Sequence, residues 1–301
     1  MSKNVSRMIT AFDGWKESLQ SFSNVPKGMF GRVAIIKCGN VEINLDELDF
    51  EVETEFDDNV DKNEGTINIY NLAKTTIQEL KQCCKDRKEL TITAGYKGDT
   101  GVIFKGVIIK VYSKSDELDT VTTLYLLDTE DAGGGNDGIK DKTYKKGTKA
   151  SYILKDLIGY LDLPLAVFSV RRDHVYKDEV KVNGEIWEEI KKQAEVCGIS
   201  VYVNNRMIYA RHLSEGDNIN FTVSAETGLI GSPEEFYEDI ETEDYTETIH
   251  GYKVKMLLQH RMTTAAIINL NAKDVSGQFR VRAGKHIINE SEATTEIEVI
   301  G

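Results

Sequence analysis

The sequence predicts a mainly β protein with an α/β insert (α+β), in which two antiparallel β-barrel domains flank a small α/β domain. Two patterns predict this class. Apolar and polar residues alternate in short runs over the first and last thirds of the chain, as in half-buried strands. Between them, apolar residues recur every three or four positions, as on the buried face of a helix. The expected divisions are an N-terminal arm at 1–30, a first β-barrel at 31–132, the α/β domain at 140–215 and a second β-barrel at 216–301.

The first β region is expected to follow an arm that ends in the breaker-rich segment NVPKGMFG. After the arm, runs such as VAIIK, ELTITAGY and TVTTLYLLD alternate between apolar and polar residues. One helix interrupts them, with its apolar residues Ile77, Leu80 and Cys84 three and four positions apart. Thr76 and Glu79 have the spacing of a capping box at its start. Short strands at turn-spaced intervals with one helix are typical of a closed or nearly closed antiparallel barrel.

The middle region begins with KGTKASYILKDLIGYL, whose apolar residues share one helical face and whose start Thr148 or Ser151 is expected to cap. In GEIWEEIKKQAEVCG, Gly198 follows the last periodic residue, where a helix C-cap glycine belongs. The run ISVYVNNRMIYARH then indicates two strands with a tight turn at Asn204 and Asn205. Two helices and a hairpin predict a small α/β domain.

The last region returns to alternation and contains the densest run of charge in the chain, at 234–248. Eight acidic residues lie between Glu234 and Glu247. We interpret this segment as a solvated acidic loop. The alternative is an acidic surface that lines a channel or faces a basic partner. Phe236, Tyr237 and Tyr245 favour that alternative, because a purely solvating loop seldom keeps aromatic residues. These three are candidate partner-interface residues.

Composition limits the possible partners. The net charge of −13 disfavours a surface that neutralises nucleic-acid phosphates or lies on an anionic membrane, so we expect no specific nucleic-acid binding and no membrane partner. The N-terminus has no apolar core of signal-peptide length, and no run of apolar residues is long enough to span a bilayer, so we expect a soluble chain made in a cytoplasm. The cysteines have no disulfide or zinc spacing and are expected to be reduced and mostly buried: Cys38, Cys83, Cys84 and Cys197.

Motifs for catalysis or cofactor binding fail on their spacing. The five histidines stand singly, and no G-x-S-x-G occurs. The formal G-x-G-x-x-G of the 133–138 loop is not followed by a helix, so we interpret it as a linker. The calcium-like spacing of DDNVDKNEG has Lys62 where glycine is needed and Asn68 where the closing glutamate belongs. We therefore predict no catalytic residue, no cofactor and no metal, and that the protein is not an enzyme.

Three blocks of sequence resemble the hub proteins of phage-tail baseplates and contractile injection particles, of the late-control protein D type. The first is NEGTINIYNLAKTTIQELK with ITAGYKGDTGVIFKGVI, and the second is YKKGTKASYILKDLI. The third is ETGLIGSP, an acidic gap, then YKVKMLLQHRM and GQFRVRAGKH. Within ETGLIGSP, the resemblance marks Gly228, Gly231 and Pro233 as structural turn residues. The N-terminal arm has no counterpart in the family, and many relatives have proline where this chain has Gln259 and His260.

The resemblance implies a virion structural protein of the baseplate, in a phage tail or a bacteriocin-like particle that is assembled in the bacterial host cytoplasm. Family hubs are homotrimers in which each chain supplies two tube-like barrel domains. Such a ring has near-sixfold symmetry and adapts the hexameric tail tube protein to the trimeric spike protein, with tape measure and other baseplate proteins as further partners. The resemblance also makes the strand-to-helix corner a candidate partner interface: Tyr70, Asn71 and Leu72. We expect an acidic lumen, which would repel DNA and let it slide.

Two other functions are open to such a chain. A tail-associated peptidoglycan hydrolase would have its catalytic centre in the middle domain, but that domain contains only His174 and His212 and no nucleophile arrangement. A tail-tip receptor-binding module, for carbohydrate or another receptor, would show exposed aromatic residues on loops and no affinity for the tube. A cell-wall clearing assay separates the first alternative from a hub, and assembly with tube protein separates the second.

Overall fold

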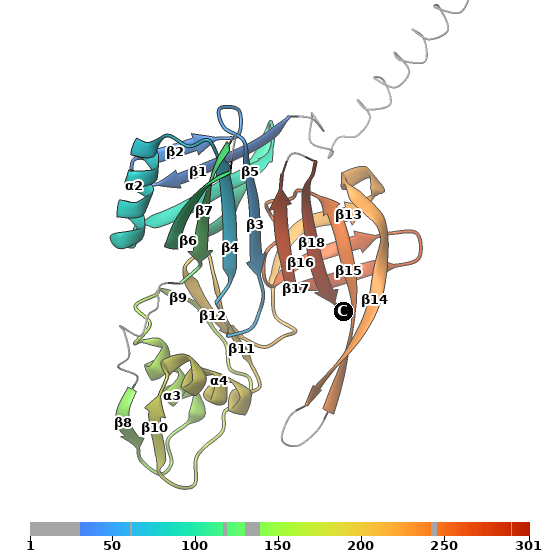
Figure 1. Cartoon of the computed structure of the whole chain (residues 1–301). Helices are drawn as coiled ribbons and strands as arrows, with labels where there is room; N and C mark the ends of the chain where they lie inside the picture. Colours follow the sequence, from blue (N-terminus) through green and yellow to red (C-terminus); the bar gives the residue numbers. More distant parts are fainter. Residues whose placement is uncertain (1–30, 61, 117–118, 130–138, 242–245, 290) are drawn as a thin grey trace, which may run out of the picture.

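The computed structural model describes residues 31–60, 62–116, 119–129, 139–241, 246–289 and 291–301. The N-terminal arm, the glycine-rich 133–138 loop and Tyr245 lie outside the described residues. The chain is mainly β with an α/β insert, as the sequence predicts (Figure 1). No helix among the described residues is long and apolar enough to cross a membrane. The four cysteines are free thiols, and all but the half-buried Cys84 are buried.

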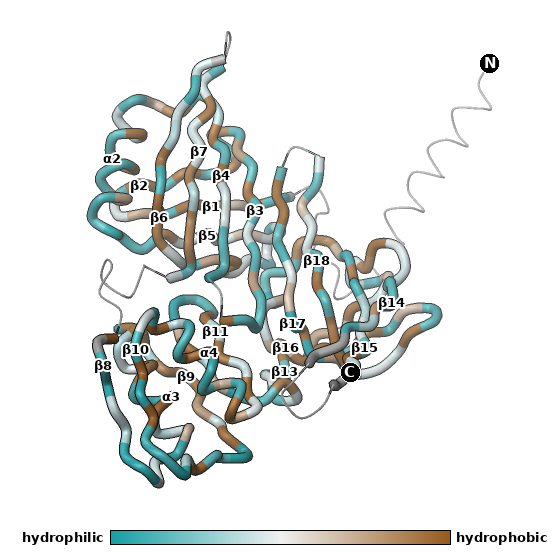
Figure 2. Tube along the Cα trace, turned by 60° about the horizontal axis from the view of Figure 1, so that its bottom comes forward, coloured by the Kyte–Doolittle hydropathy of each residue, from teal (hydrophilic) through white to brown (hydrophobic). Residues whose placement is uncertain are grey.

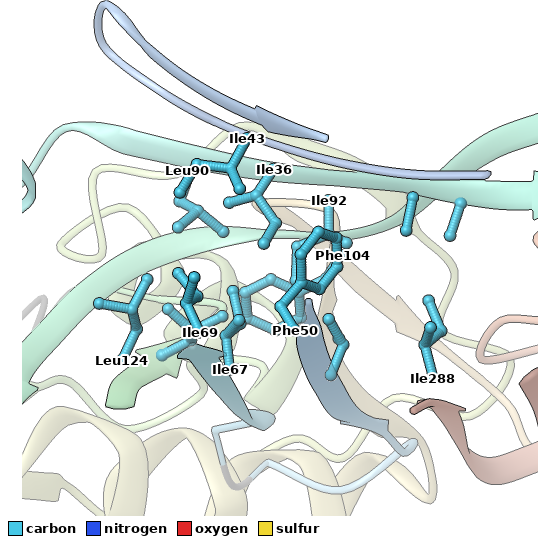
Figure 3. Packing of buried hydrophobic residues seen from close by; sticks show 14 of the residues in the cluster. Ile36, Ile43, Phe50, Ile67, Ile69, Leu90, Ile92, Phe104, Leu124 and Ile288 are labelled. Carbon is cyan, nitrogen blue, oxygen red and sulfur yellow. The ribbon is translucent and has the colours of Figure 1, made fainter. Parts of the chain in front are cut away.

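The first β region is one antiparallel sheet with the strand order β3-β4-β7-β6-β5-β1-β2. It folds over, so that Ile36 and Ile92 on one side face Ile67 and Phe50 on the other (Figure 3). These side chains are almost fully buried and form the first hydrophobic core. The elements are β1 (Arg32–Cys38), β2 (Val41–Asn44), β3 (Phe50–Phe56), β4 (Glu64–Tyr70), α2 (Lys74–Lys85), β5 (Glu89–Tyr96), β6 (Asp99–Asp116) and β7 (Asp119–Leu127).

The middle region packs helices α3 and α4 against two small sheets, β10-β8 and β11-β12-β9. Its core is separate from the first one and includes Leu154, Ile190 and Val201. The elements are β8 (Ile139–Tyr144), α3 (Ala150–Ile158), β9 (Leu165–Phe168), β10 (Val180–Gly184), α4 (Ile186–Cys197), β11 (Ser200–Asn204) and β12 (Met207–Arg211).

The last region has the strand order β14-β15-β18-β17-β16-β13 around a third core that includes Val254, Ile268 and Val299. All pairs are antiparallel except β13 with β16, which are parallel. The elements are β13 (Asp217–Ser224), a 3-10 turn (Ala225–Thr227), β14 (Leu229–Glu241), β15 (Thr246–Leu257), β16 (Ala266–Asn271), β17 (Ser276–Ile288) and β18 (Ala293–Ile300). The three cores follow the order of the predicted domains, whose boundaries stay a prediction.

The two β regions are not closed barrels. Within the described residues, the strands form one open thirteen-stranded sheet, because β17 of the last region pairs with β3 of the first. β17 is longer than its neighbour β16, so its second half, Gly284–Ile288, is free to pair with Val52–Phe56. Strands β6, β7, β4, β3, β17, β18 and β15 consequently lie side by side across the molecule (Figure 2). Periodicity within each strand could not predict this junction.

The acidic segment is a β-hairpin and not a loop. β14 and β15 pair antiparallel from Glu234–Lys253 to Glu241–Thr246, which covers most of the segment at 234–248. In Figure 1 the hairpin extends beyond the rest of the last region. β14 and β15 pair with each other along the hairpin, and the side chains of Glu234, Glu235 and Glu238 are exposed to solvent.

Several local predictions are corrected. Helix α2 begins two residues before Thr76, with Ala73 as N-cap and no side-chain cap, so the predicted capping box is absent. Neither Thr148 nor Ser151 caps α3. Asp173 takes that role, because its carboxylate accepts hydrogen bonds from the backbone N–H and the hydroxyl of Ser151 at 3.0 and 2.6 Å.

Two turns in the middle region test the remaining local predictions. Gly198 is the C-cap of α4, with a φ of 64° in the left-handed region, as the sequence predicts. The tight turn between β11 and β12 is formed by Asn205 and Arg206, one residue later than predicted. Both have positive φ, 50° and 62°, which is the conformation of a two-residue hairpin turn with the native twist.

Candidate functional site

The outer face of the shared sheet carries polar and charged side chains, because alternate residues of each strand point to the core. In β3, Val52 and Thr54 are buried, whereas Glu51, Glu53 and Glu55 point away from the core. The same alternation holds in β4, where Ile67 and Ile69 are buried and their neighbours are only partly so. A single surface therefore runs from β6 across β3 to β15.

Opposite charges alternate across this face. Lys253 of β15 lies 3.1 Å from Glu298 of β18, and Lys255 lies 3.0 Å from Glu296. Lys285 of β17 continues the ladder, 3.7 Å from Glu296 and 3.5 Å from Glu53 of β3. The hydrogen bonds that Lys255 donates to Glu296 and Glu292 raise the pKa of Lys255. These pairs are partly exposed, so each adds little stability, but together they cross the β17–β3 junction.

The part of the face over β4, β7 and β6 is less charged. Asn68 of β4 donates a hydrogen bond to Glu51 at 3.2 Å and accepts one from Thr123 of β7 at 2.9 Å. Lys110 of β6 lies over the ring of Tyr125 at 5.3 Å. Exposed apolar side chains gather on the β6–β7 hairpin, with exposed fractions of 38%, 52% and 39% for Ile109, Tyr112 and Tyr125. Such a patch on a hairpin is typical of an interaction surface.

The β14–β15 hairpin carries an aromatic cluster. Tyr237 stacks on His250 with ring centroids 4.8 Å apart, and His250 in turn meets Tyr252 edge to face at 5.0 Å. The Tyr237 hydroxyl donates a hydrogen bond to Glu235 at 2.9 Å, and His250 Nε2 lies 2.7 Å from the same oxygen. These hydrogen bonds lower the pKa of Glu235. Tyr237 is still 65% exposed, and Phe236 packs over Gly251.

The strand-to-helix corner at Tyr70, Asn71 and Leu72 is built mainly for folding. Asn71 has a φ of 53°, and its side chain donates to Asp119 at 2.8 Å and accepts from the backbone N–H of Thr120 at 3.0 Å. It thereby ties the corner to the start of β7. Leu72 is buried in the first core and is not available to a partner in this structure. Tyr70 is partly exposed at the end of β4, so a contact through it or Asn71 stays a prediction.

The turn residues of ETGLIGSP lie at the start of β14. Gly228 and Gly231 have φ values of 106° and 73°, which favour glycine. Pro233 stands where the pairing of β14 with β15 shifts in register, and a proline is tolerated there because the ladder is already interrupted. A pocket of about 190 Å³ opens between this turn and the β16–β17 connection at 272–275.

Two ionic contacts that join distant parts of the chain were not predicted from the sequence. Asp58 and Arg280 form a buried pair at 2.6 Å, and the Arg280 Nε donates to the backbone oxygen of Glu215 at 2.9 Å. Asp99, the first residue of β6, is held by Arg261 at 2.7 Å and by His260 at 3.1 Å. Nothing in the local sequence of Arg280 marks it as one half of a buried pair, because Arg282 follows two residues later in the same strand.

Two residues of the calcium-like spacing, Asp57 and Asn63, make structural contacts. Asn63 is buried, and its amide donates to Asp128 at 2.7 Å and to the backbone oxygen of Val203 in β11 at 3.1 Å. Its side-chain oxygen accepts from the backbone of Asp57 at 2.9 Å. Burial raises the pKa of Asp128 to about 7. Among the described residues, no three histidine, cysteine or acidic side chains are grouped so as to hold a metal.

The fold that carries this surface is the fold of phage-tail proteins. Its particular counterparts among solved structures include the tail protein from Neisseria meningitidis MC58, with a TM-score of 0.63 at 7% identity over 90% of this chain and 97% of that one. The 43 kDa tail protein of prophage MuSo2 from Shewanella oneidensis has a TM-score of 0.60 at 7% identity, over 89% of this chain and 98% of that one.

A third counterpart comes from a secretion machine. The E. coli c3393 protein, a component of the type VI secretion system with structural similarity to T4 bacteriophage tail proteins, has a TM-score of 0.59 at 11% identity. The match covers 88% of this chain and 76% of that one. No protein-family model and no curated protein matches the sequence. At these identities the likeness is one of fold, and it agrees with the resemblance seen in the three sequence blocks.

Proposed function

We propose that this chain is a structural baseplate hub, a homotrimer whose near-sixfold ring adapts a hexameric tail tube to a trimeric spike. The tail-protein fold supports the general role. The tube protein hexamer, the spike and the tape measure protein are the proposed partners, and the baseplate of a virion or phage-tail-like particle is the proposed location. The role is mechanical, so we propose no enzymatic activity.

The observation that carries this proposal is an internal repeat of topology. The strand order β3-β4-β7-β6-β5 of the first region recurs as β14-β15-β18-β17-β16 in the last. A bulge repeats as well: pairing skips Ile109 between β6 and β7, and it skips Arg282 between β17 and β18. In both places the bulge follows the second residue pair of the two-strand ladder, which is Ile108 with Leu126 in the first region and Val281 with Val299 in the last.

The repeat supports a ring because the two units join through unlike edges. β17 of the second unit pairs with β3 of the first, which is a head-to-tail contact. A head-to-tail contact can be repeated until rotation closes a ring. Three copies would supply six units, so a threefold object would present a near-sixfold face. In such a ring the charged outer face of the shared sheet would line the channel, with lysines set among its glutamates.

Assembly with the tube tests the hub. Purified chain mixed with tube protein from the same particle should cap tube ends with threefold rings in negative-stain electron microscopy, and it should increase light scattering. A chain that leaves the tube ends bare would contradict the proposal. A cell-wall clearing assay with the same preparation is expected to show no lysis, and clearing would instead favour the hydrolase.

A further inference from the structure

We propose that β14 of one copy pairs antiparallel with the outer half of β6 of the next copy, in a register that the junction within one chain defines. The inference rests on the proposed ring and identifies the strands that close it. The binding partner is a second copy of this chain. Each unit has two sheet edges that can pair with a neighbouring unit. One edge is paired within the chain, and the other is unpaired among the described residues.

The unpaired edges are the outer half of β6 and the free side of β14. In the repeat they are equivalent to the edges of β17 and β3 that pair within the chain. β5 pairs with β6 only as far as Val107, and within the described residues no strand pairs with the rest of that edge. Arg87 donates to the carbonyl oxygen of Ile108, where the paired part ends. β14 is the last strand at its end of the sheet, with β15 on one side only. Unpaired edges of this length are templates for another strand.

The shared bulge fixes the equivalence of residues. Counting from it, Lys114 of β6 corresponds to Ile287 of β17, since Val107 and Arg280 occupy the same place. In the same way Glu234 of β14 corresponds to Glu53 of β3. When the residue pairs are followed across the next two strands, β15 and β18 or β4 and β7, both residues lead to the same position of the repeat. Within the chain, Ile287 lies opposite Glu53. The expected contacts between copies are Lys114 opposite Glu234, Ser113 opposite Glu235, Tyr112 opposite Phe236 and Val111 opposite Tyr237.

The side chains in this register complement one another. Lys114 meets an acidic residue and extends the alternating ladder to Lys253, which lies across from Glu234. Tyr112 meets Phe236, and aromatic pairs directly opposite each other stabilise antiparallel strands. The intramolecular junction has an ion pair in this area too, between Lys285 and Glu53. Tyr112 and Tyr237, 52% and 65% exposed in one chain, would both be covered.

Disulfide trapping tests the register. In a background with Cys84→Ser, the pair Ser113→Cys with Glu235→Cys should give covalent dimers and trimers on oxidation. The pair Ser115→Cys with Glu235→Cys is the matched control, because it is shifted by two residues. Directly opposed Cβ atoms are near disulfide distance and diagonal ones are not, so we expect roughly tenfold faster cross-linking for the opposed pair.

A second opposed pair covers the alternation of strand geometry. Neighbouring pairs in an antiparallel ladder alternate between wide and narrow spacing, so Tyr112→Cys with Phe236→Cys is tested alongside the first. Cross-linking of at least one opposed pair over the shifted control supports the proposal. Sedimentation velocity on the uncross-linked chain separates the failures. A trimer without selective cross-links overturns the strand pairing and leaves the hub standing, whereas a chain that stays monomeric and does not cross-link overturns the ring itself.

Charge exchange provides a readout without cysteines. Lys114→Glu and Glu234→Lys should each weaken self-association by roughly tenfold, because like charges would then face each other across the strands. The two changes together should restore association. Lys37→Glu, at an exposed position on β1, is the control and should have no effect. Single variants that associate like the wild type would overturn the register.

Discussion

Asp99 and Arg261 are joined by two hydrogen bonds, of 2.8 and 2.7 Å, although 162 residues separate them in the sequence. Asp99 is the first residue of β6, and Arg261 follows β15. His260 adds a third contact to the same carboxylate at 3.1 Å. Gln259 also contacts the Arg261 guanidinium, at 2.8 Å. Gln259, His260 and Arg261 thus help to fasten the first region to the last.

Replacing Asp99 by asparagine is expected to destabilise the fold at neutral pH. The hydrogen bonds from Arg261 lower the pKa of Asp99 to about 2. A lowered carboxyl pKa contributes stability above the unfolded value near 4, and the contribution is lost as the pH falls towards 2. Because Arg261 is partly exposed, we expect a cost of about 1 kcal/mol. Urea unfolding at pH 7 and at pH 2 to 3 measures it, and the difference from wild type should shrink at the lower pH.

The control for this variant is Glu42→Gln, which removes an exposed ion pair with Lys37 at 3.0 Å. It should change the free energy of unfolding by only about 0 to 1 kcal/mol. An Asp99→Asn protein as stable as wild type at pH 7 would show that the contact between Asp99 and Arg261 contributes nothing to stability.

The buried pair of Asp58 and Arg280 should be costly to break. Both side chains are nearly inaccessible, at 3% and 6% exposure. Asp58→Ala would leave a buried guanidinium without its partner, which costs about 3 to 5 kcal/mol. Chemical denaturation followed by tryptophan fluorescence measures the loss. Lys149→Ala, which removes a largely exposed pair with Asp173, is the comparison and should cost less than about 1 kcal/mol. Equal effects of the two variants would contradict the role of burial.

His286 predicts a pH dependence of stability. It is fully buried, its Nδ1 lies 2.9 Å from the Thr295 hydroxyl and its Nε2 lies 3.2 Å from the Met262 carbonyl. Burial lowers its pKa to about 4. The neutral ring is therefore favoured in the fold, and stability should fall as the pH drops from about 6.5 towards 4, by up to about 3 kcal/mol.

The measurement is the free energy of unfolding from pH 7.5 to pH 4.5, for wild type and for His286→Gln. The variant should be less stable at pH 7.5 and should lose less stability on acidification, because glutamine at position 286 does not titrate. His174→Gln, at an exposed position, is the control and should follow the wild-type curve. Parallel curves for wild type and His286→Gln would remove His286 as the source of the pH dependence.

The sequence predicts what depends on neighbours along the chain and misses what depends on distant edges. The alternation in β4 and the C-cap at Gly198 are local, and both are found. The pairing of β17 with β3 joins strands more than 200 residues apart, and no periodicity encodes it. The acidic segment was predicted as a loop because its charge masks its strands. Whether each of these strands forms depends on the strand that it pairs with, and that partner lies on the other side of a turn.

The last prediction concerns this distant junction. Gly284 of β17 lies opposite Phe56 of β3, and a Cβ at Gly284 would come within 2.6 Å of the Phe56 ring and 2.5 Å of the backbone oxygen of Glu296. Gly284→Ala should therefore push the strands apart and cost about 1 to 3 kcal/mol. Gly277→Ala lies in the same strand, where a Cβ would meet its nearest neighbour at an ordinary 3.4 Å, and should be nearly neutral. Thermal unfolding compares them. A Gly284→Ala protein that melts with the Gly277→Ala control would mean that the junction is looser than the structure indicates.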